Sequence, residues 1–188
     1  GLRIARDNES LLTRQLDAIA QAAESRGDDA ETWVMAPMVA TSKEAQWFAE
    51  LCRERGLTAG AMIEVPAAAL MADKIMPHLD FVSIGTNDLT QYTMAADRVS
   101  PQLAYLTDPW QPAVLRLIQH TCIAGHEYNV PVGVCGEAAA DPLLACVLTG
   151  LGVNSLSAAS TAVAGVGAQL AELTFDQCQQ LADAALNS

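Results

Sequence analysis

Basic residues are scarce in this sequence, and their scarcity limits the partners that the protein binds. The 188 residues include 10 lysines and arginines against 22 aspartates and glutamates, for a net charge of −12. Proteins that bind nucleic acid neutralise its phosphates with clustered lysine and arginine side chains. We therefore expect no nucleic acid partner, and an anionic ligand would need a few local cations or a metal ion.

Zinc-binding cysteine pairs, long apolar segments and a signal peptide are absent as well. The five cysteines contain no C-x-x-C pair, which argues against structural zinc. Cys52, Cys122 and Cys178 fall in helical patterns, as buried thiols do in a reducing cytosol. No stretch approaches ~18 uninterrupted apolar residues, so we expect no membrane insertion. The start, GLRIARDNES, lacks an initiator methionine and an apolar signal segment, which predicts a cytoplasmic protein that continues upstream.

The composition that remains is typical of one globular domain with a sizeable core. Hydrophobic residues make up 51% of the chain, charged residues 17% and aromatic residues only 5%. No segment rich in proline, glycine and serine divides it. Abundant alanine beside valine, isoleucine and leucine suits helices packed tightly against a sheet.

Apolar periodicity predicts strands and helices in alternation. Short apolar runs predict strands at residues 33–35, 59–65, 81–85, 130–134 and, more weakly, 153–156. Helical spacing covers residues 9–24 and about 175–186, and further helices are predicted behind a capping box at Thr41 and Glu44, at Pro66 and at Pro112. This alternation predicts parallel strands, because each return to the same end of a sheet needs a crossover.

Two parallel architectures fit the alternation: an open doubly wound sheet and a β/α barrel. The first commonly carries a G-x-G-x-x-G turn after a strand, and none is present here. In the barrel, chemistry collects at the carboxyl ends of the strands. Polar residues follow the strands here, so we predict an α/β fold with a parallel, TIM-type β/α barrel.

Three predicted strands end in residues that are capable of chemistry. Glu64 lies at the end of the second strand, Asn87 and Asp88 follow the third, and Cys135 follows the fourth. Each has an ordinary alternative: a solvated side chain for Glu64, a helix cap for Asn87 or Asp88, and a packed thiol for Cys135. Their common position at strand ends favours a functional site.

Two carboxylates on neighbouring strand ends repel each other unless a cation lies between them. Mg²⁺ prefers oxygen ligands and often binds through one or two carboxylates, with substrate phosphate and water completing its shell. Glu64 and Asp88 are therefore candidate Mg²⁺ ligands. Arg98 offers a guanidinium to a phosphate or carboxylate, with a surface pair to Asp97 as its alternative.

Three segments resemble a known family. IEVPAAALMAD, FVSIGTNDLTQYTMAADR and VPVGVCGEAAAD are similar to signature blocks of Enzyme I of the bacterial phosphoenolpyruvate:sugar phosphotransferase system. The whole chain follows the C-terminal, phosphoenolpyruvate-binding domain of that family. Pyruvate, phosphate dikinase and phosphoenolpyruvate synthase share the barrel and weaker versions of these blocks.

The resemblance implies a phosphotransferase and a role for each candidate residue. Glu64 and Asp88 match the two Mg²⁺-binding carboxylates, Asn87 a residue that contacts the phosphate, and Arg98 an arginine that binds the substrate. Cys135 matches the cysteine that gives a proton to the methylene carbon when enolpyruvate becomes pyruvate, a role that suits a neutral thiol. The family transfers the phosphoryl group to a histidine in its own N-terminal domain, then to the carrier HPr for sugar uptake, and forms homodimers through this domain.

The sequence also departs from the family. None of His78, His120 and His126 lies in a segment that matches the acceptor motif, so residues 1–188 are predicted to be the C-terminal part of the barrel domain without the histidine domain. About five strands are predicted where the family has eight, which implies a partial barrel that lacks the N-terminal strands and is inactive alone. A family arginine aligns with Trp33 or its neighbour, and Ala140 replaces a common glycine.

Other functions fit the same residues. A Mg²⁺-dependent barrel lyase or aldolase would use the two carboxylates to stabilise an enolate, and a relative of the synthase and dikinase would reuse the same blocks. A non-catalytic dimerisation module is the third alternative, because a partial barrel has sheet edges to cover.

Overall fold

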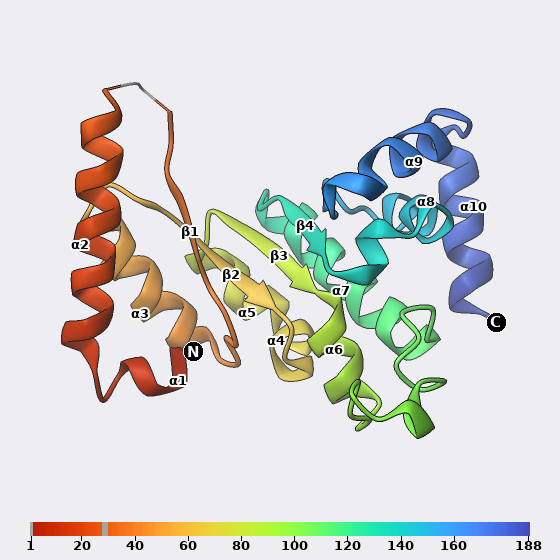
Figure 1. Cartoon of the computed structure of the whole chain (residues 1–188), viewed down its shortest axis with the longest axis horizontal. Coiled ribbons are helices and arrows are strands. Elements are labelled where there is room, and N and C mark those ends of the chain that lie inside the picture. The colour runs from red at the N-terminus through yellow and green to blue at the C-terminus, as the bar shows by residue number, and fades with distance from the viewer. Residues whose placement is uncertain (1, 28–29) are drawn as a thin grey trace.

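Five parallel strands form one sheet, in which their spatial order equals their order along the chain (Figure 1). The computed structural model describes residues 2–27 and 30–188. The strands are β1 (Trp33–Ala36), β2 (Thr58–Ile63), β3 (Phe81–Gly85), β4 (Val132–Cys135) and β5 (Ser155–Ser157). A doubly wound sheet reverses its strand order, whereas a barrel adds each strand beside the last. The order confirms the predicted partial barrel, with β1 and β5 at the edges of the described sheet.

Helices alternate with the strands and flank the sheet at both ends, where Figure 1 shows α2 and α3 beside β1 and α8 to α10 beyond β4. They are α1 (Leu2–Ala5), α2 (Glu9–Arg26), α3 (Ser42–Arg53), α4 (Pro66–Leu70), α5 (Ala72–Ile75), α6 (Thr86–Thr93), α7 (Pro112–Tyr128), α8 (Pro142–Gly150), α9 (Ser160–Ala171) and α10 (Phe175–Leu186). Short 3-10 turns are η1 (Met76–His78), η2 (Pro101–Leu103) and η3 (Glu137–Ala140).

The predicted helix signals are largely confirmed. The capping box before α3 is present, because the Thr41 hydroxyl accepts the Glu44 N–H and the Glu44 carboxylate accepts the Thr41 N–H. Pro66 and Pro112 each begin a helix. The sequence prediction omits α8 and α9, because α8 is apolar on almost every side and α9 is rich in alanine and glycine, so neither has an apolar stripe.

Two strands begin two residues later than predicted, and the preceding helix explains both shifts. The Val130 N–H donates to the Gly125 carbonyl of α7, and the Val153 N–H donates to the Leu148 carbonyl of α8. In each case a left-handed residue precedes the valine, Asn129 (φ 55°) or Gly152 (φ 100°). Both valines therefore belong to the end of a helix, and each strand begins only after them.

The two faces of the sheet differ in their surroundings. Side chains alternate along each strand, and one set, which includes Ala61 and Ile84, is fully buried in the core that the helices cover. Met62, Ser83 and Gly133 belong to the other face and are half-buried. We name this second side the lumen face, since it corresponds to the interior of a barrel.

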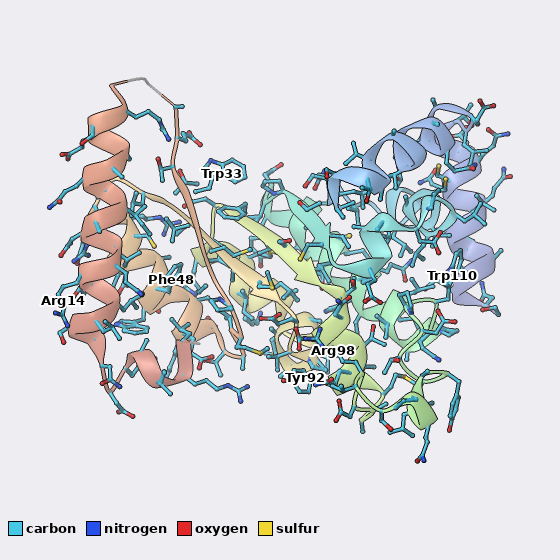
Figure 2. The ribbon with its side chains drawn as sticks, viewed as in Figure 1. Arg14, Trp33, Phe48, Tyr92, Arg98 and Trp110 are labelled. Atoms are coloured by element: carbon cyan, nitrogen blue, oxygen red, sulfur yellow. The ribbon has the colours of Figure 1, made fainter. Side chains whose placement is uncertain are left out.

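An aromatic pair occupies the amino-end part of the lumen face. The rings of Trp33 on β1 and Phe81 on β3 lie 4.6 Å apart between centroids, and Figure 2 labels Trp33 at this position. Gly60 of β2 lies between the two strands, and a Cβ there would overlap the Phe81 ring. The absence of a side chain at Gly60 is what permits this stack.

Asp80 joins α3, β2 and β3 at the amino ends of the strands. Its carboxylate accepts the Ala59 N–H at 2.8 Å and pairs with the Arg53 guanidinium at 2.8 Å. The carboxylate is partly exposed, and its charge is matched by an arginine of the same chain. This contact therefore stabilises the end of the sheet opposite to the predicted site.

The predicted buried thiols are confirmed. Cys52, Cys122 and Cys178 are buried as predicted, and Cys146, which is not among the predicted thiols, is buried as well. Burial raises the pKa of Cys52 to about 11 and that of Cys122 to about 12. Cys135 differs, since it is only half-buried. Among the helices described, none combines the length and the apolar character needed to cross a bilayer.

Gly150→Ala is expected to destabilise the protein by about 1–3 kcal/mol, because a Cβ at Gly150 would overlap the Cys178 carbonyl of α10. Gly167→Ala is the matched control, because a Cβ there meets nothing within 4 Å and alanine favours a helix over glycine by up to ~1 kcal/mol. Urea unfolding measures both free energies. Equal stabilities would contradict the close packing of α8 on α10.

Candidate active site

Glu64 lies directly after β2 and is almost fully enclosed. Its side chain is on the lumen face, two residues after Met62, and the residue is 3% exposed. The Oε1 atom accepts the Met38 N–H at 2.7 Å, and Met38 has a left-handed backbone (φ 58°) that a residue with a side chain seldom adopts. A solvated side chain, the alternative for Glu64, is therefore wrong.

Gly85 at the end of β3 makes room for this carboxylate. A Cβ at Gly85 would lie 2.8 Å from Glu64 Oε2 and 2.9 Å from Met62 Sδ. Any side chain there would push Glu64 away from the strand end. The glycine of the IGTND segment is thus a packing requirement of the neighbouring strand.

The pKa of Glu64 is raised, mainly because burial disfavours its charged form. The Asp88 carboxylate raises this pKa further, and the hydrogen bond from the Met38 backbone opposes the rise. The two carboxylates are thus close enough to repel each other. Such a pair is stabilised by a cation between its members.

Asn87 and Asp88 lie in the first turn of α6, and neither caps the helix. The N-cap position is Gly85, and no side chain of the described residues bonds to the free N–H groups there, so the capping alternative is wrong. Asn87 Oδ1 instead accepts the Glu137 N–H at 3.1 Å from the loop after β4. The first turn of a helix favours negative charge, because its N–H groups and dipole point outward there.

Cys135 ends β4 and pairs in register with Gly85 of β3. Its Sγ lies 3.6 Å from the Ile84 carbonyl oxygen, and the residue is half-buried. The four other cysteines are buried, so Cys135 is the most accessible thiol of the described residues. Glu64, Asp88 and Cys135 thus follow three neighbouring strands at the same end of the sheet.

The loop after β4 is fixed to the start of α6. The Thr86 hydroxyl donates to the Cys135 carbonyl at 2.9 Å, beside the bond between Asn87 and Glu137. Gly136 has φ 96°, and a Cβ there would lie 2.7 Å from both Asn87 Oδ1 and Thr86 Oγ1. This glycine allows the two segments to approach, and the sequence prediction does not include it or Thr86.

Arg98 lies beside α6, in the loop that follows it (Figure 2). It is exposed, and it lines a cavity of about 120 Å³ together with Thr86, Asn87, Thr90, Thr107, Pro109 and Glu137. The alternative pairing with Asp97 is absent from residues 2–27 and 30–188, and Asp97 Oδ1 accepts the Val99 N–H instead. The structure therefore brings Arg98 to Asn87, whereas Glu64, Asp88 and Cys135 lie outside this cavity.

The residues present fit a Mg²⁺ ion. No group of three or more histidine, cysteine, aspartate or glutamate side chains forms a metal cluster in the described part of the chain. Mg²⁺ does not require one, because one or two carboxylates with water and substrate oxygens complete its octahedron. Met38 occupies Glu64 Oε1, and no hydrogen bond reaches Oε2 within the described residues, which leaves that oxygen for a cation.

Comparison with known protein families identifies the family to which the chain belongs. The family of PEP-utilising enzymes, described by its phosphoenolpyruvate (PEP)-binding domain, matches residues 1–175. The chain belongs to this family. The resemblance drawn from the three signature segments is thereby confirmed, and the strand ends described above lie within the matched PEP-binding domain.

Relatives of the chain are phosphoryl-transferring proteins by name. It is 51% identical over 187 residues to a phosphoenolpyruvate-protein phosphotransferase of Streptomyces coelicolor, with 98% of this chain and 33% of the relative covered. It is 42% identical to a multiphosphoryl transfer protein of Rhodobacter capsulatus, with 99% of this chain and 23% of the relative covered. The chain thus spans about a third or less of the length of these relatives.

Solved structures support the barrel. A citrate lyase of Burkholderia xenovorans LB400 superposes with a TM-score of 0.63 over 84% of this chain and 53% of that one, at 14% identity. At this identity the likeness concerns the fold alone. The chain therefore shares its β/α architecture with a lyase and its sequence with phosphotransferases.

Glu64→Gln is expected to raise the free energy of unfolding of the metal-free protein at neutral pH, with a smaller gain toward pH 4. Folding raises the pKa of Glu64, so the stability that this group contributes is present below its unfolded pKa and is lost as the pH rises through its folded pKa. Glutamine keeps an acceptor for the Met38 N–H without the charge. Urea unfolding from pH 4 to 8 measures the difference.

The exposed Glu54→Gln is the control, because Glu54 is 68% exposed at its side chain. A difference between wild type and Glu64→Gln that stays constant across this pH range would contradict the raised pKa.

Proposed function

We propose that the chain binds PEP and Mg²⁺ at the carboxyl ends of β2, β3 and β4 as part of a phosphotransferase. The observation that carries the proposal is the enclosed Glu64 carboxylate next to Asp88, on strand ends adjoining the half-buried Cys135 thiol. Membership of the PEP-binding family supplies the class of substrate. Cys135, Asn87, Asp88, Arg98 and Glu64 are the residues that we assign to the site.

The binding residues divide between the two ends of PEP. Glu64 and Asp88 would hold Mg²⁺, which would neutralise negative charge on the substrate. Asn87, at the start of α6, and Arg98 bind the phosphoryl group, since a guanidinium and helix N–H groups both suit an oxyanion. The pyruvyl part then lies toward Cys135.

The chemistry needs a phosphoryl acceptor and a proton donor. The bond between phosphorus and the enol oxygen breaks, its electron pair stays on that oxygen, and the phosphoryl group passes to a histidine nitrogen. The enolate then forms its carbonyl while the methylene carbon takes the proton of the Cys135 thiol, which gives pyruvate. The thiolate regains a proton from solvent.

The acceptor histidine belongs, in this proposal, to an N-terminal domain of the same protein. His120 and His126 lie on α7, and His78 ends η1 with its Nε2 3.0 Å from Ser42 Oγ. None of the three lines the cavity of Arg98 and Asn87 in the described part of the chain. From that domain the phosphoryl group goes to an HPr-like carrier for sugar uptake. The protein works as a cytoplasmic homodimer formed through the barrel, and residues 1–188 bind PEP but do not complete the transfer alone.

Asp88→Asn is expected to weaken Mg²⁺-dependent PEP binding by at least about tenfold, because it removes one of two carboxylates that hold the ion. Isothermal titration of PEP with and without Mg²⁺ measures the effect. Asp97→Asn is the matched control, because it makes the same change in charge in the loop after α6 while its oxygen still accepts the Val99 N–H. Equal affinities of wild type and Asp88→Asn would refute the metal assignment.

Cys135→Ser is expected to lower the exchange of pyruvate methyl protons with deuterated water by about 100-fold or more, because a hydroxyl is a much weaker acid than a thiol. Proton NMR of pyruvate with Mg²⁺ measures this exchange and needs no acceptor histidine. PEP affinity in the same variant is the control and should change little. Exchange at the wild-type rate would remove Cys135 from its proposed role.

A further inference from the structure

An unsatisfied hydroxyl belongs to Thr90 of α6, a residue that lines the same cavity as Arg98. Thr90 is 2% exposed, and its Oγ1 has no hydrogen-bond partner in the part of the chain that the structure describes. Threonines in helices commonly donate to the carbonyl four residues earlier, as Thr121 and Thr149 do here. A buried polar atom without a partner is unfavourable, and an oxygen of a ligand bound in the cavity would supply the partner that Thr90 lacks.

The neighbours of Thr90 on the same helix are already engaged. Thr86 and Asn87 lie four and three residues earlier, on the same face of α6. Thr86 donates to the Cys135 carbonyl, and Asn87 accepts the Glu137 N–H. Among the described residues, Thr90 is thus the one of the three whose side chain makes no hydrogen bond to the loop after β4.

The opposite wall of the cavity is formed by the loop between α6 and α7. Arg98, Thr107 and Pro109 line it from this loop. Near the end of this loop lies Trp110, which Figure 2 labels. Its Nε1 donates to Asp141 Oδ2 at 3.1 Å, and Asp141 caps α8. The end of the loop nearest to α7 is therefore tied to the body of the protein.

We propose that Thr90 is a further substrate-binding residue, whose hydroxyl donates to an oxygen of the phosphoryl group that Arg98 pairs with in this cavity. The inference rests on the proposed function and extends it. Glu137 also lines the cavity, but its side chain is exposed and free to turn to solvent. The cavity of about 120 Å³ has room for a small polar group or a few waters.

The residues that line the cavity indicate that it receives the phosphoryl end of the substrate. Glu64, Asp88 and Cys135, which serve the metal and the pyruvyl part, do not line it, whereas Asn87 and Arg98 do. Thr90 therefore discriminates PEP from pyruvate, because pyruvate has no group to place there.

The test compares Thr90→Val, Thr90→Ser and Thr93→Val by calorimetric titration of PEP with Mg²⁺. A hydroxyl that bonds to a charged group predicts a rise in Kd of about tenfold to a hundredfold in Thr90→Val and recovery to within a few-fold in Thr90→Ser. Thr93 is the matched control: it lies on α6, its Oγ1 also lacks a partner in the described residues, and it does not line the cavity. Thr93→Val is expected to bind PEP as wild type does.

Thermal unfolding of the ligand-free proteins separates binding from folding. Both valine variants should unfold at the wild-type temperature or above it, because each loses an unpaired buried hydroxyl. Pyruvate with Mg²⁺ is the second probe, and Thr90→Val should bind it as wild type does.

Each remaining outcome overturns a named claim. PEP binding that is equal in wild type and Thr90→Val would mean that the hydroxyl meets only water, and it would leave the proposed function intact. Equal weakening of PEP and pyruvate would overturn the assignment to the phosphoryl end. Wild-type protein that binds no PEP would overturn the proposed function together with this inference.

Discussion

The constraint on which the site depends is an enclosed carboxylate that has no cation beside it among the described residues. Glu64 is 3% exposed, its pKa is raised mainly by burial, and a second carboxylate, Asp88, adds to the rise. A chain selected only for stability would place an apolar or amide side chain at this point. The free-energy cost of burying this charge is explained if a divalent cation and an anionic substrate bind beside Glu64.

The surrounding backbone is shaped to keep that carboxylate in place. Met38 gives its N–H to Glu64 from a left-handed conformation, and Gly85 leaves the space that Oε2 occupies. On the next strand, Gly136 lets the loop after β4 reach Thr86 and Asn87. These contacts join the ends of β1, β2, β3 and β4, so the positions of the groups that we propose to bind the metal and donate the proton are set by the register of the sheet.

The sequence predicts the parts of this arrangement that depend on local pattern. Strand ends, helix caps and an isolated glutamate are visible in a linear chain, and so is the cluster at Asn87 and Asp88. The contacts that depend on the packed fold are not, because the partner of Glu64 is a backbone N–H 26 residues away and the lone hydroxyl of Thr90 differs from Thr121 only in its surroundings. The starts of β4 and β5 shift for the same reason: Val130 and Val153 belong to the ends of helices whose last carbonyls they bond.

Two carboxylates bind backbone N–H groups at opposite ends of the sheet, and they differ in whether a cation lies beside them. Asp80 and Glu64 each accept a backbone N–H from a neighbouring segment, but Asp80 has Arg53 beside it and Glu64 has no ion pair among the described residues. An arginine or lysine engineered beside Glu64 would give its carboxylate an ion pair like the one that Asp80 forms with Arg53. The internal cation would compete with the proposed Mg²⁺ ion for the same oxygens, so a barrel stabilised in this way would bind that metal more weakly.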